Sequence, residues 1–385
     1  MDTVKGFRDF IGKEALKREQ IKQLLVKTFK SYGFEPAETP VIEQEAFVRG
    51  DNPQDEAVSD TFKLQDRGKR NLALRYEFTF QLKRISKNKK LPYKRFQIGP
   101  VFRDEPATAN RLRQFIQCDV DIVGSTIKEE AEILAIEYFM LKKLGINATI
   151  NVNNRKLLNE ILDKGGIKQK DKEKVIREID KLDKISEKDV KANLKKYNAE
   201  KILPIFKKPE SYFKRYEAFK EIEELKKYCN CYGVKFTFLP SLARGLSYYT
   251  GSIFEVKTKE MRETISAGGS YLINGLQSTG IAFGLDRISQ LAKIKPEEKR
   301  ILIISIGEDK ESIKLAEKLR KEDIQCMIMY KKISKALDYA NINSFPYVIF
   351  LGKDEVKKKK VKLRDMKTGK EKMISISNIS KNLLL

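Results

Sequence analysis

The sequence predicts an α+β fold with antiparallel strands, a helical insertion and a small C-terminal α/β domain. Two extended runs, residues 96–103 and 111–122, flank a connection rich in Asp, Pro and Asn, which is typical of a long antiparallel hairpin. Residues 159–232 are dominated by Lys, Glu and Asp around a helical stripe of apolar residues. From residue 301 onward, strand and helix patterns alternate, which indicates an α/β domain.

Length and hydropathy set the broad class of the protein. A chain of 385 residues is long enough for two or three domains with a substantial core. No apolar run approaches the length of a membrane span, and the first residues lack the basic-then-apolar layout of a signal peptide. We therefore expect a cytoplasmic protein with no membrane partner.

The net charge and the absence of histidine limit the partners and the catalytic groups that this protein can have. The formal net charge of +24 indicates a polyanionic partner, with nucleic acid ahead of membrane, although a generally lysine-rich composition is the alternative. The chain has no histidine, and its four cysteines are scattered, so we expect no metal site built from His or Cys. Catalysis must then rest on carboxylates, Arg, Lys, Tyr, a bound metal or the substrate itself.

The elements before the long hairpin follow from local patterns. Apolar residues at helical spacing predict a helix over residues 14–32, and Gly33 supplies its stop. Residues 34–43 form a helix-to-strand passage that contains Pro40. Residues 62–64 and 72–75 flank a turn rich in Gly and Asp, which predicts another hairpin.

The later elements follow from the same patterns. Residues 128–144 repeat apolar residues at helical spacing, and residues 148–152 return to a strand. After the charged helical segment, the C-terminal alternation predicts strands and helices in turn, over residues 301–306, 312–319, 324–329, 334–340 and 347–351.

The long hairpin carries more charge on one face than a core strand usually tolerates. From residue 111 to residue 122 the odd positions are mostly polar and the even positions mostly apolar. Arg103, Arg111 and Arg113 are expected near its mouth, where Arg suits phosphate or carboxylate. Gln117, Asp119 and Asp121 offer acceptors for a polar, cationic small molecule. The pattern suits the floor of a site for ATP and an amino acid. The alternative is a surface hairpin whose charges are merely solvated.

These residues resemble a known family. Residues 102–105, Arg111 and the run QCDVD at 117–121 resemble motif 2 of class II aminoacyl-tRNA synthetases, in the form shown by archaeal and eukaryotic-type histidyl-tRNA synthetases. Residues 34–43 resemble motif 1, in which the matching proline, Pro40, lies at the dimer interface. Residues 278–288 resemble motif 3, with Arg287 at the position of its arginine and Asp286 where Glu is more usual.

Two further stretches resemble signatures specific to histidyl-tRNA synthetases. Residues 240–251, PSLARGLSYYTG, resemble SLARGLDYYTG, with Ser247 in place of Asp. Residues 266–271, SAGGSY, resemble AGGRYD more weakly, because Ser270 and Leu272 replace Arg and Asp. These departures concern the fine geometry of the histidine pocket more than the reaction.

The resemblance implies a class II synthetase fold, with a catalytic domain on a mostly antiparallel sheet. The implied domains are the first part of the catalytic domain (1–158), the helical insertion (159–232), the second part of the catalytic domain (233–298) and an anticodon-binding domain (299–385). The partners it implies are ATP, Mg²⁺, L-histidine, histidine tRNA and a second copy of the chain in a homodimer.

The resemblance also implies roles for single residues. Activation of histidine by ATP and its transfer to tRNA would use Arg103, Arg244 and Arg287 in catalysis. The ATP-binding residues would be Arg103, Glu105, Arg111 and Arg287. The histidine-binding residues would be Glu77, Thr79, Gln117, Asp121, Arg244, Tyr248, Tyr249 and Tyr271.

Two rival functions and one hypothesis stand beside this interpretation. A non-catalytic paralogue, such as the regulatory subunit of ATP phosphoribosyltransferase, keeps the fold but binds histidine as a signal; retained phosphate arginines and an RNA-binding type of C-terminal domain argue against it. A synthetase for another amino acid is disfavoured by residues 244–251. The absence of histidine is compatible with an enzyme that is made during histidine starvation, or with compositional drift.

Overall fold

The computed structural model describes residues 2–50, 56–108, 110–243, 248–294 and 300–379. The chain divides into two compact units, Met1–Lys295 and Pro296–Leu385. None of the described helices is long and apolar enough to cross a membrane.

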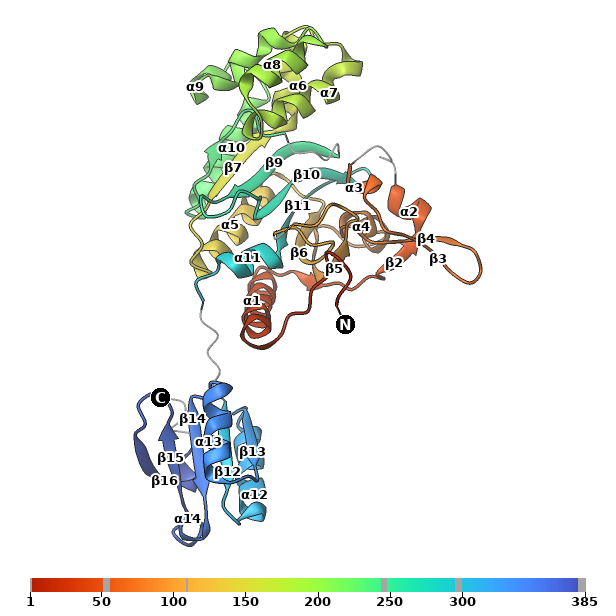
Figure 1. The fold of residues 1–385 in the computed structure, drawn as a ribbon. Coiled ribbons are helices and arrows are strands. Elements are labelled where there is room, and N and C mark those ends of the chain that lie inside the picture. The colour runs from red at the N-terminus through yellow and green to blue at the C-terminus, as the bar shows by residue number, and fades with distance from the viewer. Residues whose placement is uncertain (1, 51–55, 109, 244–247, 295–299, 380–385) are drawn as a thin grey trace. The chain divides into compact units, whose positions relative to one another are not determined.

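The first unit is built on an eight-stranded sheet (Figure 1). Its five inner pairings are antiparallel, and the outermost pairing at each edge is parallel. This confirms the prediction of a mostly antiparallel sheet. In spatial order the strands are β1 (Glu35–Pro36), β5 (Tyr93–Phe102), β6 (Gln114–Val123), β11 (Leu276–Gly284), β10 (Ser266–Ile273), β9 (Tyr249–Lys257), β7 (Thr149–Asn154) and β8 (Thr237–Phe238).

Helices cover one face of this sheet. They are α1 (Gly12–Ser31), α5 (Ile127–Lys143), α10 (Phe219–Cys231) and α11 (Leu285–Leu291). Their apolar residues share one core with the even-numbered residues of β6, Cys118, Val120 and Ile122, so the alternation predicted along this strand is confirmed. Helix α5 begins at a capping box in which Thr126 and Glu129 bond to each other's backbone N–H groups. The opposite face of β6 is left for the polar residues.

The predicted long hairpin is present as β5 and β6, with Arg95 opposite Asp121 and Gln97 opposite Asp119. Strand β6 begins at Gln114, which is later than the alternation from residue 111 suggested. Arg111 instead forms an isolated bridge with Thr108 inside the connecting loop. The loop is therefore longer than the sequence pattern indicated, and it holds the arginines expected at the mouth.

The first unit also contains a three-stranded sheet. It contains the predicted hairpin of residues 62–75 as β3 (Lys63–Gln65) and β4 (Asn71–Leu74), with β2 (Ile42–Gln44) on the other side of β4. Three short helices surround it: α2 (Glu45–Arg49), α3 (Glu56–Ser59) and α4 (Thr79–Ile85).

The segment between β7 and β8 is helical, as its charged and apolar pattern predicted. Its elements before α10 are α6 (Arg155–Lys164), α7 (Gln169–Ile179), the 3₁₀ turn η1 (Asp180–Asp183), α8 (Glu187–Lys195), the 3₁₀ segment η2 (Glu200–Lys207) and α9 (Glu210–Phe213). Their apolar side chains form one cluster that also includes Tyr249 and Tyr271 of the central sheet. The insertion therefore packs directly against strands that carry expected site residues.

The second unit is the α/β domain that the alternation predicted. Its sheet order is β13-β12-β14-β15-β16, and the first three of these strands are parallel. The two long helices contribute to separate apolar clusters. The elements are β12 (Ile301–Ser305), α12 (Asp309–Lys321), β13 (Cys326–Met329), α13 (Ile333–Ile342), β14 (Tyr347–Leu351), α14 (Lys353–Lys357), β15 (Lys360–Asp365), β16 (Glu371–Ser375) and η3 (Ile376–Asn378).

Candidate active site

A small pocket of about 140 Å³ lies over the polar face of β6. Gln117, Asp119 and Asp121 line it, and each is less than a tenth exposed. The polar face of the hairpin is therefore not solvated, which contradicts the alternative of a surface hairpin. Polar groups without partners are costly to bury, so this pocket is suited to a ligand that satisfies them.

The expected histidine-binding residues other than Arg244 meet at this pocket. Besides Gln117 and Asp121, they are Glu77, Thr79, Tyr248, Tyr249 and Tyr271. Glu77 lies between β4 and α4, and Thr79 is the first residue of α4. Tyr249 begins β9, Tyr248 immediately precedes it, and Tyr271 is on β10, the strand between β9 and β11. The pocket is therefore lined by side chains from three parts of the sequence: the start of α4, strand β6, and strands β9 and β10.

The two aspartates of the pocket, Asp119 and Asp121, both have raised pKa values. Burial raises the pKa of Asp119 well above its ordinary value, and the neighbouring Asp121 and Glu77 raise it further, against the attraction of Arg95 and Arg103. Burial also raises the pKa of Asp121, while the Arg95 guanidinium lowers it. Such shifts are frequent where a protein prepares a site for a charged or hydrogen-bonding ligand.

Sequence reasoning missed two residues of β5 that support this pocket. Arg95 is fully buried, and its Nη2 lies 2.9 Å from Asp121 Oδ2. Gln97 is buried too, and its Nε2 donates to Thr39 Oγ1 at 2.7 Å. The hairpin register was the available signal, because it places Arg95 opposite Asp121 and Gln97 opposite Asp119.

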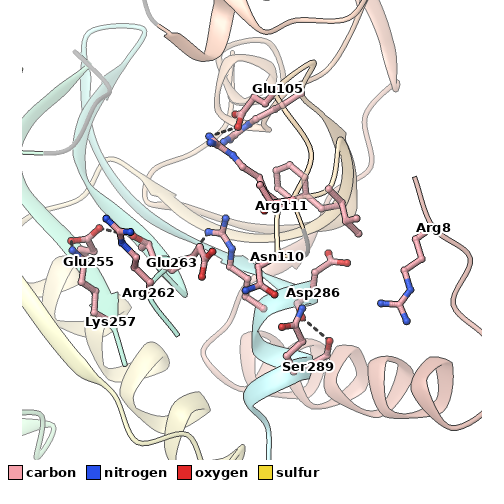
Figure 2. A pocket seen from close by; sticks show the side chains of 18 of the residues that line it. Arg8, Glu105, Asn110, Arg111, Glu255, Lys257, Arg262, Glu263, Asp286 and Ser289 are labelled. Atoms are coloured by element: carbon pink, nitrogen blue, oxygen red, sulfur yellow. Dashed lines mark hydrogen bonds and ion pairs between the residues drawn. The ribbon is translucent and has the colours of Figure 1, made fainter. Parts of the chain in front are cut away.

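A larger cavity of about 780 Å³ adjoins the small pocket. Arg103, Phe115 and Arg287 line both spaces, so they form a shared wall. Arg111 and Glu105 also line the larger cavity, which brings together the three described arginines that were expected to bind ATP. Figure 2 shows the charged groups around this space, with Arg111 beside Glu105, Asp286 and Ser289 on α11, and Glu255, Lys257, Arg262 and Glu263 along another wall.

Each of these three arginines has a contact that fixes its direction. Arg103 Nε donates to Tyr76 O at 3.3 Å, and its guanidinium lies 5.3 Å from the centre of the Phe115 ring. Arg287 Nη1 donates to Thr264 O at 2.7 Å. Arg111 forms an ion pair with Glu105, although its side chain is 53% exposed. Arg113, also expected at the hairpin mouth, pairs with Asp104 at 3.1 Å and does not line either cavity among the described residues.

The N-terminal segment lines part of the larger cavity, which sequence reasoning did not foresee. Arg8 and Phe10 line it, and Phe10 lies under the Arg18 guanidinium at 3.7 Å. Arg18 pairs with Asp286 at 3.0 Å, and the other oxygen of Asp286 accepts from Ile116 N at 3.0 Å. The Asp that replaces the more usual Glu of motif 3 thus joins α1, α11 and β6.

The remaining predicted positions have different outcomes. Arg244 and Ser247 lie outside the described residues. Ser270, which replaces the arginine of the second signature, donates to Glu130 of α5, and Leu272 is exposed. Neither Ser270 nor Leu272 is among the described residues that line the small pocket.

Comparisons with known proteins agree over the whole chain. Residues 6–288 match the family model described as histidyl-tRNA synthetase, and residues 300–384 match the anticodon binding domain. A histidine–tRNA ligase of Bacillus cereus is 35% identical, with 100% of this chain and 99% of the relative covered. A histidine–tRNA ligase of Wolinella succinogenes is 33% identical, with 99% and 98% covered.

Solved structures show the same fold. The histidyl-tRNA synthetase of Nostoc sp. PCC 7120 superposes with a TM-score of 0.88 at 23% identity, covering 100% of this chain and 98% of that one. A Bacillus halodurans structure described as an ATP phosphoribosyltransferase regulatory subunit/histidyl-tRNA synthetase has a TM-score of 0.77 at 20% identity, covering 91% and 97%. At these identities the likeness concerns the fold alone.

Proposed function

This chain belongs to the histidyl-tRNA synthetase family, and we propose that it activates L-histidine with ATP and transfers the histidyl group to the 3′ end of histidine tRNA in the cytoplasm. One observation supports this most directly. A narrow, buried pocket lined by acceptors shares the wall of Arg103, Phe115 and Arg287 with a larger cavity lined by arginines. An amino acid in the first space and a triphosphate in the second would meet at that wall.

In the first step, a carboxylate oxygen of histidine attacks the α-phosphorus of ATP. The bond from this phosphorus to the bridging oxygen breaks, and pyrophosphate leaves while histidyl-adenylate stays bound. Arg103, at the shared wall, is assigned to the α-phosphate together with Arg244, and Arg111 and Arg287 to the β- and γ-phosphates. Fixed positive groups of this kind stabilise the charge that develops in the transition state. Glu105 orients Arg111 through their ion pair.

The amino-acid pocket orients the substrate for this attack. Glu77, Thr79 and Gln117 are assigned to the α-amino group of histidine. Asp121, Tyr248, Tyr249 and Tyr271 form the end that receives the imidazole ring. In the second step, a ribose hydroxyl of the terminal tRNA nucleotide attacks the acyl carbon and AMP leaves. Because the chain has no histidine to act as a base, we assign the hydroxyl proton to a phosphate oxygen of the departing AMP.

The site is suited to a magnesium ion that is bound mainly by the phosphates of the nucleotide. The described residues contain no cluster of three or more Asp, Glu, Cys or His side chains that could hold a metal ion. Glu255 and Glu263 do line the larger cavity. Mg²⁺ commonly binds one or two carboxylates, several waters and substrate phosphates, so either glutamate is a suitable protein ligand. When bound, the ion would neutralise phosphate charge.

We also propose tRNA and a second copy of this chain as macromolecular partners. The C-terminal unit matches the anticodon-binding family, and the large positive charge of the chain favours RNA. The three-stranded sheet beside Pro40 exposes Ile42 and Leu64, with 49% and 40% of their surface accessible. This apolar face and the exposed Pro40 support a homodimer. Light scattering on the purified protein measures its mass directly.

The decisive experiment measures exchange of labelled pyrophosphate into ATP with each amino acid, followed by charging of purified tRNAs. We expect exchange only with histidine and charging only of histidine tRNA. Exchange with a different amino acid would contradict the specificity that we propose. Binding of histidine without exchange or charging would instead support the regulatory paralogue.

A further inference from the structure

The helical insertion forms part of the wall of the larger cavity. Three of its residues line this cavity together with Arg287 of α11: Asp180 and Asp183, at the two ends of the 3₁₀ turn η1, and Lys184, which follows the turn. The space that we assign to ATP is therefore bounded by the insertion as well as by the central sheet and its helices.

Two side chains of η1 attach the insertion to the catalytic domain. Asp180 Oδ1 accepts a hydrogen bond from Ala243 N at 3.2 Å, and Asp183 forms an ion pair with Lys257, the last residue of β9. The Asp183 and Lys257 side chains are 40% and 28% exposed, so water screens this pair only in part. Burial lowers the pKa of Lys257, but the hydrogen bond to Asp183 and the charge of Glu255 raise it overall. Lys257 is thus held as a cation between the insertion and the sheet.

From Lys257 a continuous series of contacts leads to Arg287. Lys257 Nζ lies 3.5 Å from Oε2 of Glu255, which is two residues earlier on β9 (Figure 2). The other oxygen of this buried carboxylate, Oε1, accepts a hydrogen bond from Thr264 Oγ1 at 2.6 Å. Thr264 O in turn accepts from Arg287 Nη1 at 2.7 Å. The contact that orients this arginine is therefore linked to the insertion.

This arrangement makes the position of Glu255 depend on how firmly Asp183 holds Lys257. The attraction between two charges grows as they approach and is stronger where water is excluded. If Asp183 were neutral, Lys257 would move towards the buried carboxylate of Glu255 and draw it away from the Thr264 hydroxyl. The Thr264 carbonyl, and with it the direction of Arg287, would then change.

We propose that Asp183 of the insertion is a positioning residue for ATP. Its effect passes along this series of contacts to Arg287, which we assign to the β- and γ-phosphates. The inference rests on the proposed function and deepens it, because it gives the insertion a part in the activation of the amino acid, before any tRNA is bound.

The sign of the effect distinguishes positioning from simple charge. Asp183 is a negative group on the wall of a cavity proposed for a triphosphate, so by charge alone its removal should strengthen ATP binding. A direct contact between a released Lys257 and a phosphate would have the same sign. Positioning predicts the opposite sign, because a misdirected Arg287 holds the phosphates less well.

The test measures KM values in pyrophosphate exchange. For Asp183→Asn we expect the KM for ATP to rise about 3- to 5-fold, the scale of one partly exposed ion pair, while the KM for histidine stays constant. Asp183→Glu keeps the charge and should restore most of the ATP affinity. A change confined to ATP, with rescue by the conservative variant, is not expected from a general loss of folding.

A double-mutant cycle tests whether Asp183 acts through Lys257. In protein that already carries Lys257→Met, Asp183→Asn should change the KM for ATP by less than about 1.5-fold, because the contact through which it acts is gone. Glu187→Gln is the matched control. Glu187 pairs with Lys207 within the insertion, and neither lines the larger cavity among the described residues, so its KM for ATP should equal that of wild type.

Two results would overturn the inference: tighter or unchanged ATP binding in Asp183→Asn, or an equal effect of this change with and without Lys257. Both are read against wild-type protein that exchanges pyrophosphate with histidine. If the wild type did not exchange, the proposed function itself would fail. Calorimetric titration of ATP into the same variants would then still decide the positioning role, so the two failures are distinguishable.

Discussion

The two adjoining cavities differ in how their charged groups are prepared for a ligand. In the small pocket the supporting guanidinium, Arg95, is fully buried, and acceptors such as Asp119 Oδ1 have no hydrogen-bond partner among the residues that the structure describes. In the larger cavity the Arg111 side chain is 53% exposed and already paired with Glu105. We infer that the enclosed pocket provides selectivity for the amino acid. A wrong amino acid would leave buried polar groups there without hydrogen bonds, and this would weaken its binding. The open cavity provides charge that water and salt partly screen.

The largest expected effect comes from the residue that the two cavities share. Arg103→Ala removes a positive group at the wall where the histidine carboxylate and the α-phosphate are proposed to meet. We expect pyrophosphate exchange to fall by about 10²-fold or more, as loss of one preorganised donor usually does. The measurement is kcat/KM for exchange, with folding checked by thermal denaturation.

Arg113→Ala is the matched control for Arg103→Ala. Arg113 is another arginine of the hairpin mouth, with a partly exposed ion pair to Asp104 and a hydrogen bond from Nε to Glu105 O at 3.0 Å, but it lines neither cavity among the described residues. We expect a loss of about 3-fold or less. Equal losses in the two variants would show that the shared wall has no special role.

The sequence was most informative where a local pattern determines the structure. Alternation along 111–122 identified the polar and apolar faces of β6, and helical spacing identified α1 and α5. The motif resemblance then named Glu77, Thr79 and Tyr271, which no local pattern connects. Arg95 was missed because a buried charge in a strand is recognised only once its partner strand and register are known. Arg8 and Phe10 were missed because only tertiary packing brings the N-terminal segment to the cavity.

A second prediction concerns how much burial of a carboxylate lowers the stability of the protein beneath the helix-covered face of the sheet. Glu137 of α5 is completely buried on the helix-covered face, where it accepts a hydrogen bond from Ser266 Oγ, and burial raises its pKa to about 8. The unfolded chain loses this proton near pH 4.5, whereas the folded protein keeps it up to about pH 8. Stability therefore falls as the pH rises between these values.

Glu137→Gln removes this dependence, because glutamine keeps the shape and does not ionise. We expect the variant to be more stable than wild type by roughly 4 kcal/mol at pH 8, from about 1.4 kcal/mol for each pH unit between the two pKa values, and nearly equal at pH 4.5. The melting temperature measured at the two pH values tests this, and the KM for histidine should not change. A variant that is less stable at pH 8 would show that the Glu137 charge is compensated.

The smallest expected effect concerns Arg111, the exposed arginine of the larger cavity. Arg111→Ala removes a cation that is half in solvent and shared with Glu105, so its attraction to a phosphate is weakened before ATP binds. We expect the KM for ATP to rise roughly 5-fold and the KM for histidine to stay constant, as one exposed charge-assisted contact contributes about 1 kcal/mol. Raising the salt concentration should weaken ATP binding more in wild type than in the variant. A 10²-fold loss, equal to that of Arg103→Ala, would mean that the open cavity is as strongly preorganised as the enclosed pocket, and the contrast between them would fail.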